Sequence, residues 1–359
     1  MTFSSRFTFL SVASGIAAIW MASALAQTAI PPSPLPLPNP YRVDDSFRLE
    51  MPKGRQALGS VSAVNVGADT NIYVSHRCVD DSCAGHDSID PILVYDPRGH
   101  LLRSMGAGLF NWPHGILAMP DQSVWATDAG VVAGQDGGRG IGSQVFHFDR
   151  TGKVIMTLGK AGVAAAGHDT LNRPSDVLIG KNGDIFVADG HSGGDKRIVK
   201  FNSHGEYVTE CGSAGSGPGQ IGQPHALVMD SQGRLFLADR SNSRINIYDQ
   251  NCTFLMEWKQ FGRPSGIAID ANDTMYVVDT QTTAGRPGFE NGIYIGSAKD
   301  GKVTAFIPKV RPRSLWEVTA ARGTTTDATN MESIAVTPDG SAIYGGEVGL
   351  KTVIRFVRK

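Results

Sequence analysis

The chain has 359 residues, 41% of them hydrophobic and 19% charged, and its 33 basic side chains nearly balance 34 acidic ones. This balance excludes the strongly basic surface of a nucleic-acid-binding protein and the acidic bias of a disordered tail. The length fits two ordinary domains or one large all-β domain, and the 43 glycines favour turns and strands.

The first predicted element is an export signal at residues 1–26. Arg6 is followed by an apolar run and by a small-residue cleavage pattern that ends at Ala26. We therefore expect a secreted or periplasmic protein; an uncleaved anchor helix is the alternative. Residues 27–45 include a proline-rich stretch and are predicted to form an extended linker.

A four-strand pattern then recurs in six copies. Each copy has a short apolar strand, most often after a proline corner, a second strand that in most copies ends in Asp, and two further strands joined by a glycine turn. The sixth copy lacks a fourth strand, and residues 47–51 have the alternation of that outermost strand. We predict an all-β fold for residues 46–359: a six-bladed β-propeller closed by an N-terminal outer strand.

The longest loops of the predicted propeller all open on one face, where binding or catalysis is expected. One residue near the start of each innermost strand should point to the central axis on that face. In ring order these six residues are Ser62, His114, Ser175, His225, Ser265 and Glu332.

His114, His225 and Glu332 occupy alternate blades, so their side chains should converge. Imidazole nitrogens and a carboxylate oxygen are suitable ligands for Zn²⁺, and also for Fe²⁺ or another divalent ion. A single corner histidine is more often a packing residue, but three candidate ligands on alternate blades favour a metal site. A long loop containing Arg311 and Trp316 could cover the mouth of the channel.

Two more groups lie near this point in the same register. Arg77 ends a second strand and is predicted to hold a substrate anion or to stabilise an oxyanion. His191 follows Asp189-Gly190 and is predicted to transfer a proton. Either side chain could instead stabilise a loop. The repeated Asp residues, with Arg197, Arg240 and Arg244, are predicted to have structural roles.

The chain contains four cysteines. Cys78 and Cys83 flank a four-residue loop and could form a disulfide that staples it. Cys211 and Cys252 fall near opposite ends of their predicted strands, so the sequence leaves their pairing doubtful.

Several motifs resemble the NHL-repeat propellers and, more narrowly, the peptidyl-α-hydroxyglycine α-amidating lyase family, over about residues 61–357. They are Ser75-His76-Arg77, Asn111-Trp112-Pro113-His114-Gly115, Pro174-Ser175-Asp176-Val177, Asp189-Gly190, Gln223-Pro224-His225-Ala226-Leu227 and Ala238-Asp239-Arg240. The resemblance implies an NHL-type propeller. It also implies zinc held by histidines on alternate blades, with an arginine and a tyrosine that cleave an α-hydroxyglycine peptide into an amide and glyoxylate.

Carried across by position, two zinc histidines match His114 and His225, and the catalytic arginine matches Arg77. The third histidine is replaced by Glu332 and the tyrosine by His191. Ser333 replaces an aspartate that the family uses for a structural calcium ion, which puts that ion in doubt.

We therefore expect an exported metal-dependent lyase or hydrolase, with zinc as the first choice of metal, acting on a small polar or peptide-derived substrate that differs from the family's own. The alternative is a non-catalytic NHL propeller that binds protein, peptide or glycan on its loop face. We expect a monomer, with no nucleic-acid partner and no membrane association beyond export.

Overall fold

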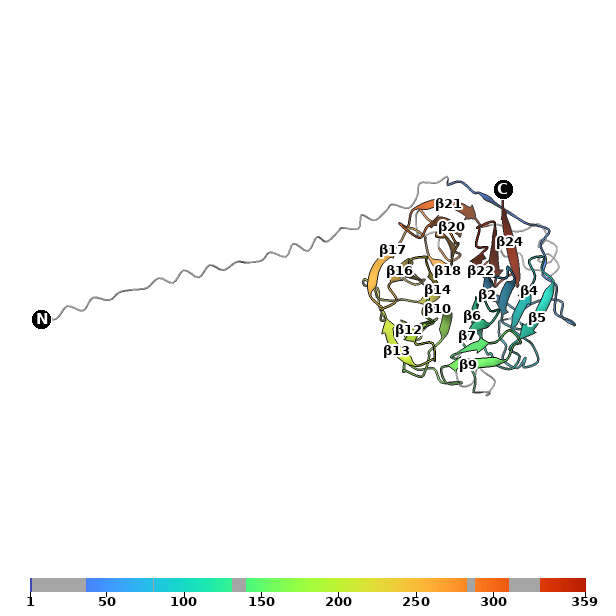
Figure 1. Ribbon diagram of the computed structural model, residues 1–359. Coiled ribbons are helices and arrows are strands. Elements are labelled where there is room, and N and C mark those ends of the chain that lie inside the picture. Colours follow the sequence, from blue (N-terminus) through green and yellow to red (C-terminus); the bar gives the residue numbers. More distant parts are fainter. Residues whose placement is uncertain (2–36, 80, 131–139, 283–287, 310–329) are drawn as a thin grey trace. The chain divides into compact units, whose positions relative to one another are not determined.

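The computed structural model describes residues 1, 37–79, 81–130, 140–282, 288–309 and 330–359 (Figure 1). The predicted signal, most of the proline-rich stretch and the loop with Arg311 and Trp316 lie outside these residues. The chain divides into two compact units, Met1–Ile30 and Pro31–Lys359, and the fold belongs to the second.

Six four-stranded antiparallel sheets form the blades of a β-propeller. Blades 1 to 3, from the innermost strand outward, contain β2 (Val61–Val66), β3 (Ile72–His76), β4 (Ile92–Tyr95), β5 (Leu101–Met105); β6 (Pro113–Ala118), β7 (Val124–Asp128), β8 (Gln144–Phe148), β9 (Val154–Leu158); β10 (Pro174–Ile179), β11 (Ile185–Asp189), β12 (Arg197–Phe201), β13 (Tyr207–Cys211). Blades 4 to 6 contain β14 (Pro224–Met229), β15 (Leu235–Asp239), β16 (Arg244–Tyr248), β17 (Phe254–Trp258); β18 (Pro264–Ile269), β19 (Thr274–Asp279), β20 (Gly292–Ser297), β21 (Val303–Pro308); β22 (Met331–Val336), β23 (Ala342–Glu347), β24 (Thr352–Arg358), β1 (Tyr41–Val43).

The innermost strands contact one another in a closed ring around the axis (Figure 1). This confirms the predicted all-β, six-bladed propeller. Within the described ranges, no helix is long and apolar enough to cross a membrane.

The core lies between the blades. The second strands β3, β7, β11 and β15 are buried along their whole length, because a neighbouring blade covers each face. The outer strands β5, β9 and β13 alternate between partly buried and exposed side chains until their last residue, which is buried. Each hydrophobic cluster therefore combines residues of two adjacent blades; one, for example, joins Tyr73 of blade 1 to Phe146 of blade 2.

The ring is closed by an N-terminal strand, as predicted, but a different one. β1, Tyr41–Val43, pairs antiparallel with β24, so the predicted linker 27–45 contains the closing strand and the prediction of residues 47–51 was wrong. The alternation there has another cause: Phe47 and Leu49 are buried between blades 1 and 6, where the Phe47 ring lies 5.7 Å from that of Tyr344.

Both cysteine pairs form disulfides. The predicted Cys78–Cys83 bond is confirmed. Cys211 and Cys252 are also bonded, so the doubt raised by their strand positions is removed. Cys211 ends an outer strand of blade 3, and Cys252 lies in the outer turn of blade 4. Because blades are twisted, each outer strand ends against the outer turn of the next blade; equivalent contacts join Gly152 to Met105, Gly205 to Leu158 and Gly301 to Trp258.

Candidate metal centre

The side chains at the axis are presented by a repeated irregularity. In every blade, the pairing of the innermost strand with the second strand shifts just after the first residue, as between Pro113 and Ile116 or Met331 and Ser333. A bulge of this kind re-aims a side chain out of the ladder. His114, His225 and Glu332 are the residues at this position in blades 2, 4 and 6.

His114 and His225 are held in the same way. Nδ1 of His114 lies 2.7 Å from the carbonyl oxygen of Ser175, and Nδ1 of His225 lies 2.6 Å from that of Ser265. Since a carbonyl only accepts, Nδ1 carries the proton in both rings, and Nε2 carries the lone pair. Both Nε2 atoms are buried; that of His114 has no hydrogen-bond partner among the described residues, whereas that of His225 faces the carboxylate of Glu332.

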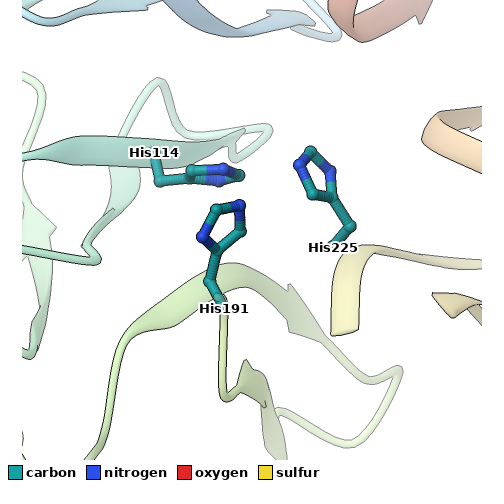
Figure 2. A group of neighbouring side chains, drawn as sticks. All are labelled: His114, His191 and His225. Carbon is teal, nitrogen blue, oxygen red and sulfur yellow. The ribbon is translucent and has the colours of Figure 1, made fainter. Parts of the chain in front are cut away.

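His191 completes a group of three imidazoles (Figure 2). One nitrogen from each of His114, His191 and His225, which we call the histidine triad, lies within 4.8 Å of the others. His191 follows β11 through Gly190, whose φ of 122° and contact with the Asp195 carbonyl oxygen leave no room for a Cβ.

Polar contacts surround the His191 ring on both sides. Its Nδ1 lies 2.8 Å from Oγ of Ser192, and NH2 of Arg240 lies 3.3 Å from its Nε2. The position predicted for a proton-transfer group is thus inside the site, and it is close enough to the other two rings to share a metal ion.

Glu332 lies against the triad. Its Oε2 is 2.8 Å from Nε2 of His225 and 3.4 Å from NH1 of Arg240. Burial alone would raise the pKa of the Glu332 carboxyl, but His225, Arg240 and Arg77 outweigh burial and hold this pKa well below its usual value. Glu332 is therefore ionised at neutral pH.

The three imidazoles are neutral. Burial is the largest cause that holds the pKa of His114 well below its usual value, and the neighbouring His225 and Arg77 add to it; burial with the other two histidines and Arg240 does the same for the pKa of His191. Burial and Arg240 also lower the pKa of His225. Neutral imidazole is the form that binds metal ions.

Arg77 lies at the edge of the site. Its guanidinium is 3.6 Å from the centre of the Trp112 ring, and NH1 pairs with Asp81 at 2.7 Å. Nε and NH2 of Arg77 are buried and have no hydrogen-bond partner in the part of the chain that the structure describes. Arg77 therefore has two donors available for an anion or a carbonyl oxygen.

Sequence reasoning missed Arg240, which it assigned to a structural role with Arg197 and Arg244. Those two do pair with the strand-end residues Asp189 and Asp239. Arg240 instead contacts Glu332 and His191. The sequence did contain an indication of this position, because Arg240 follows the second strand of blade 4 just as Arg77 follows the second strand of blade 1.

A cavity of about 480 Å³ opens beside the triad on the loop face. His191 and Trp112 form part of its wall, together with Asn111, Arg173 and Asp81. The site thus combines lone pairs that face inward, uncommitted arginine donors and space for a small molecule. The unpartnered Nε2 of His114 and the convergence of three imidazoles fit a divalent metal ion.

Comparison with known proteins gives relatives of two kinds. No family model matches the chain. Human NHL repeat-containing protein 3 is 28% identical over 76% of this chain and 74% of its own length. A probable peptidyl-alpha-hydroxyglycine alpha-amidating lyase of Caenorhabditis elegans is 28% identical over 53% of this chain and 56% of its own length.

A peptidyl-glycine alpha-amidating monooxygenase of Mus musculus is 30% identical over 60% of this chain, but the match spans only 23% of that protein. Among solved structures, a streptogramin B lyase has a TM-score of 0.51 at 11% identity, covering 89% of this chain and 98% of its own, and this supports the fold alone. The chain is thus a six-bladed β-propeller with homologues among NHL repeat proteins and amidating lyases.

Proposed function

We propose that this protein is an exported, metal-dependent enzyme of the lyase or hydrolase type that acts on a small polar substrate at the loop-face mouth of the channel. The observation that carries the proposal is the buried Nε2 atom of His114, which has no hydrogen-bond partner among the described residues and lies in a group of three imidazoles whose nitrogens are within 4.8 Å of one another. Buried polar atoms are rarely left without a partner, so such an atom in such a group calls for a ligand.

His114 and His225 would hold the ion, with His191 and Glu332 close enough to bind it or to carry a proton. When bound, a divalent ion would supply Lewis-acid chemistry by polarising a substrate oxygen. Arg77 would bind a substrate anion or carbonyl through its free donors, and its contact with Trp112 fixes the guanidinium plane. The cavity beside His191 would hold the rest of the substrate and limit its size.

The homologous lyases support the lyase class, but the substrate is proposed to differ from theirs. Glu332 and His191 stand where the resemblance implies a histidine and a tyrosine, so the groups that face the reacting atoms differ. We expect little or no cleavage of an α-hydroxyglycine peptide. Rapid release of glyoxylate from that peptide would show that the relatives' reaction is retained.

Metal analysis of the purified protein tests the proposal. We expect about one divalent ion per chain, lost in His114→Ala and in His225→Ala and retained in His204→Ala, which changes an exposed histidine in the turn before β13. Unchanged metal content in the two site variants would contradict the proposed metal-dependent active site. It would favour the alternative, a non-catalytic propeller that binds its partner on the loop face.

Export is proposed on separate grounds. Two disulfides are typical of proteins that fold in an oxidising compartment. If residues 1–26 are a cleaved signal, N-terminal sequencing of protein from the periplasmic or secreted fraction should begin at Gln27. The same preparation tests the expected monomer by size-exclusion chromatography.

A further inference from the structure

The second strands of blades 3 and 4 end in buried carboxylates that are neutralised by arginine. Asp189 pairs with Arg197 at 3.2 Å, and Asp239 pairs with Arg244 at 3.0 Å. In both blades the arginine begins the third strand and stands directly opposite the aspartate in the ladder. A guanidinium at this position supplies the positive charge that a carboxylate needs when water cannot reach it.

Blade 6 has a carboxylate at this position but no guanidinium opposite it. Glu347 ends β23, and its partner in the ladder is Thr352. Oε2 of Glu347 accepts a hydrogen bond from the backbone N–H of Asn330 at 2.8 Å. Oε1 is buried and has no hydrogen-bond partner among the described residues, and Glu347 as a whole is 0% exposed. Such an oxygen is costly to leave alone, so it calls for a ligand.

A small cavity lies beside Glu347, between blades 5 and 6. Its volume of about 20 Å³ is room for one occupant of the size of a water molecule or a metal ion. Asn291, which directly precedes β20, also lines this cavity, and its Oδ1 is a second buried oxygen without a partner in the part of the chain that the structure describes. Carboxylate and amide oxygens are the ligands that hard cations prefer.

Two other charged residues line the cavity, Asp279 and Lys309. Oδ2 of Asp279 already accepts a hydrogen bond from the backbone N–H of Arg263 at 2.9 Å. Burial raises the pKa of Glu347 to about 8, although the hydrogen bond from Asn330 and the charge of Lys309 both lower it. The charge of Lys309 thus compensates only in part for burial, and a cation next to Oε1 would favour the ionised carboxylate.

We infer that the cavity between blades 5 and 6 binds one small hard cation, of the size of Na⁺ or Ca²⁺, through Oε1 of Glu347 and Oδ1 of Asn291. The cation takes the place that Arg197 and Arg244 fill in blades 3 and 4. The site shares no residue with the histidine triad or with Glu332, so it is independent of the proposed function. By joining blade 5 to blade 6, the ion would stabilise the closed ring.

Thermal unfolding of full-length protein, freed of metal by chelation, tests this site. The midpoint is measured in choline chloride, in NaCl and with added CaCl₂, at equal ionic strength. An ion that binds only the folded state raises the midpoint, so we expect a rise in at least one of the two metal salts, and that salt identifies the occupant. The rise should be absent in Glu347→Gln, which keeps the size of the side chain but removes its charge.

Two control variants should keep the rise. Glu206→Gln changes an exposed carboxylate in the turn before β13. The double variant His114→Ser, His225→Ser removes the two anchored histidines of the axis, so a rise that persists in it belongs to another site. Thr352→Arg restores the pairing of blades 3 and 4 and should lose the rise, because the guanidinium fills the place of the cation.

The opposite outcomes overturn the inference. A midpoint that responds to neither ion would show that Glu347 is buried without a cation. A rise of equal size in wild type and Glu347→Gln would place the ion elsewhere. A rise that disappears in the double histidine variant would assign it to the axis. A full response in folded Thr352→Arg would show that the ion does not replace a guanidinium.

Discussion

The six axial corners share one backbone position but fall into two kinds. In blades 1, 3 and 5 the corner residue is serine, and its hydroxyl is used within the fold: Oγ of Ser175, for example, has the carbonyl oxygens of Ala188 and Pro224 at 3.2 and 3.0 Å and shares its one hydrogen between them. In blades 2 and 4 it is histidine, which uses Nδ1 for the fold and turns Nε2 toward the axis, where that of His114 has no partner among the described residues and that of His225 faces Glu332. The same scaffold position thus serves packing in one blade and chemistry in the next.

The two kinds of corner depend on each other. The carbonyls that fix His114 and His225 belong to Ser175 and Ser265, the corner residues of the following blades. By the same pattern, blade 6 would use the carbonyl of Ser62, but an ionised Glu332 has no proton to donate to it. Its contacts are with His225 and Arg240 instead, so blade 6 departs from blades 2 and 4 in anchoring as well as in residue type.

The largest effect is expected when the histidine corners are converted into serine corners. The double variant His114→Ser, His225→Ser should keep the propeller fold but lose at least 100-fold in metal affinity, because both anchored donors are removed. Titration calorimetry with Co²⁺ measures the affinity, and circular dichroism confirms the fold. Retained metal affinity in a folded double variant would show that His114 and His225 are not metal ligands.

The next effect concerns the anchoring of blade 6. Arg240→Ala should destabilise the metal-free protein by about 2 kcal/mol, because it leaves the partly buried Glu332 carboxylate with His225 as its one remaining side-chain partner among the described residues. Adding Glu332→Gln should recover part of the loss, since the uncompensated charge is gone. Urea unfolding measures both; if the double variant is as unstable as the single one, packing and not charge explains the effect.

Lowering the pH should reduce the stability of the protein through its histidine corners and not through its serine corners. Burial and neighbouring charges lower the pKa of His114 and His225 in the folded protein, whereas histidines of the unfolded chain titrate near 6.5. The unfolded state therefore binds more protons below pH 6.5, so the metal-free protein is fully stable above that pH and loses stability as pH falls. The double serine variant should lose less, as measured by urea midpoints across this range.

His76 provides an internal reference for that experiment. Burial lowers its pKa to about 3, and it is present in both proteins, so some acid sensitivity remains in the variant. An equal loss of stability in the two proteins would mean that the corner histidines do not titrate differently on folding.

The smallest effect is expected at a serine corner. Ser175→Ala removes the hydrogen bond that Oγ shares between two carbonyls but keeps the carbonyl that anchors His114, so it should cost about 1 kcal/mol and leave metal affinity unchanged. Thermal unfolding and cobalt titration measure the two quantities. A marked fall in affinity would show that the serine side chain, and not only its carbonyl, positions the metal site.

The corner residues were predictable from sequence because four of the six follow a proline and the strand repeat places Ser62 and Glu332 at the same position. Their register alone brings His114, His225 and Glu332 to one axis, and His191 lies near it because it follows Gly190 just after the end of β11. The role of Arg240 was not predictable in the same way. Arg197 and Arg244 begin the third strands of their blades and pair with strand-end aspartates, and the sequence alone did not separate Arg240 from them; its contacts with Glu332 and His191 do.

Two other features depended on packing between blades, which strand patterns do not report. Apolar and polar residues alternate around Phe47 and Leu49 in the same way whether the segment is a strand of a sheet or packs between two blades. The sequence therefore placed the closing strand at residues 47–51, a few positions after its true place at Tyr41–Val43. The Cys211–Cys252 bond depends on the twist that brings an outer strand to the next blade's turn. A strand alignment that ignores this twist places Cys211 and Cys252 at opposite ends of their strands.

The pairing of β1 with β24 also makes the order of synthesis matter. Blade 6 is built from both ends of the chain, and it carries Glu332, so this carboxylate reaches the axis only after the last strand has been made. A chain that stops before residue 332 would keep β1 but lack Glu332 and β24, the strand with which β1 pairs. The ring of side chains at the axis is therefore complete only after the two ends of the chain have met.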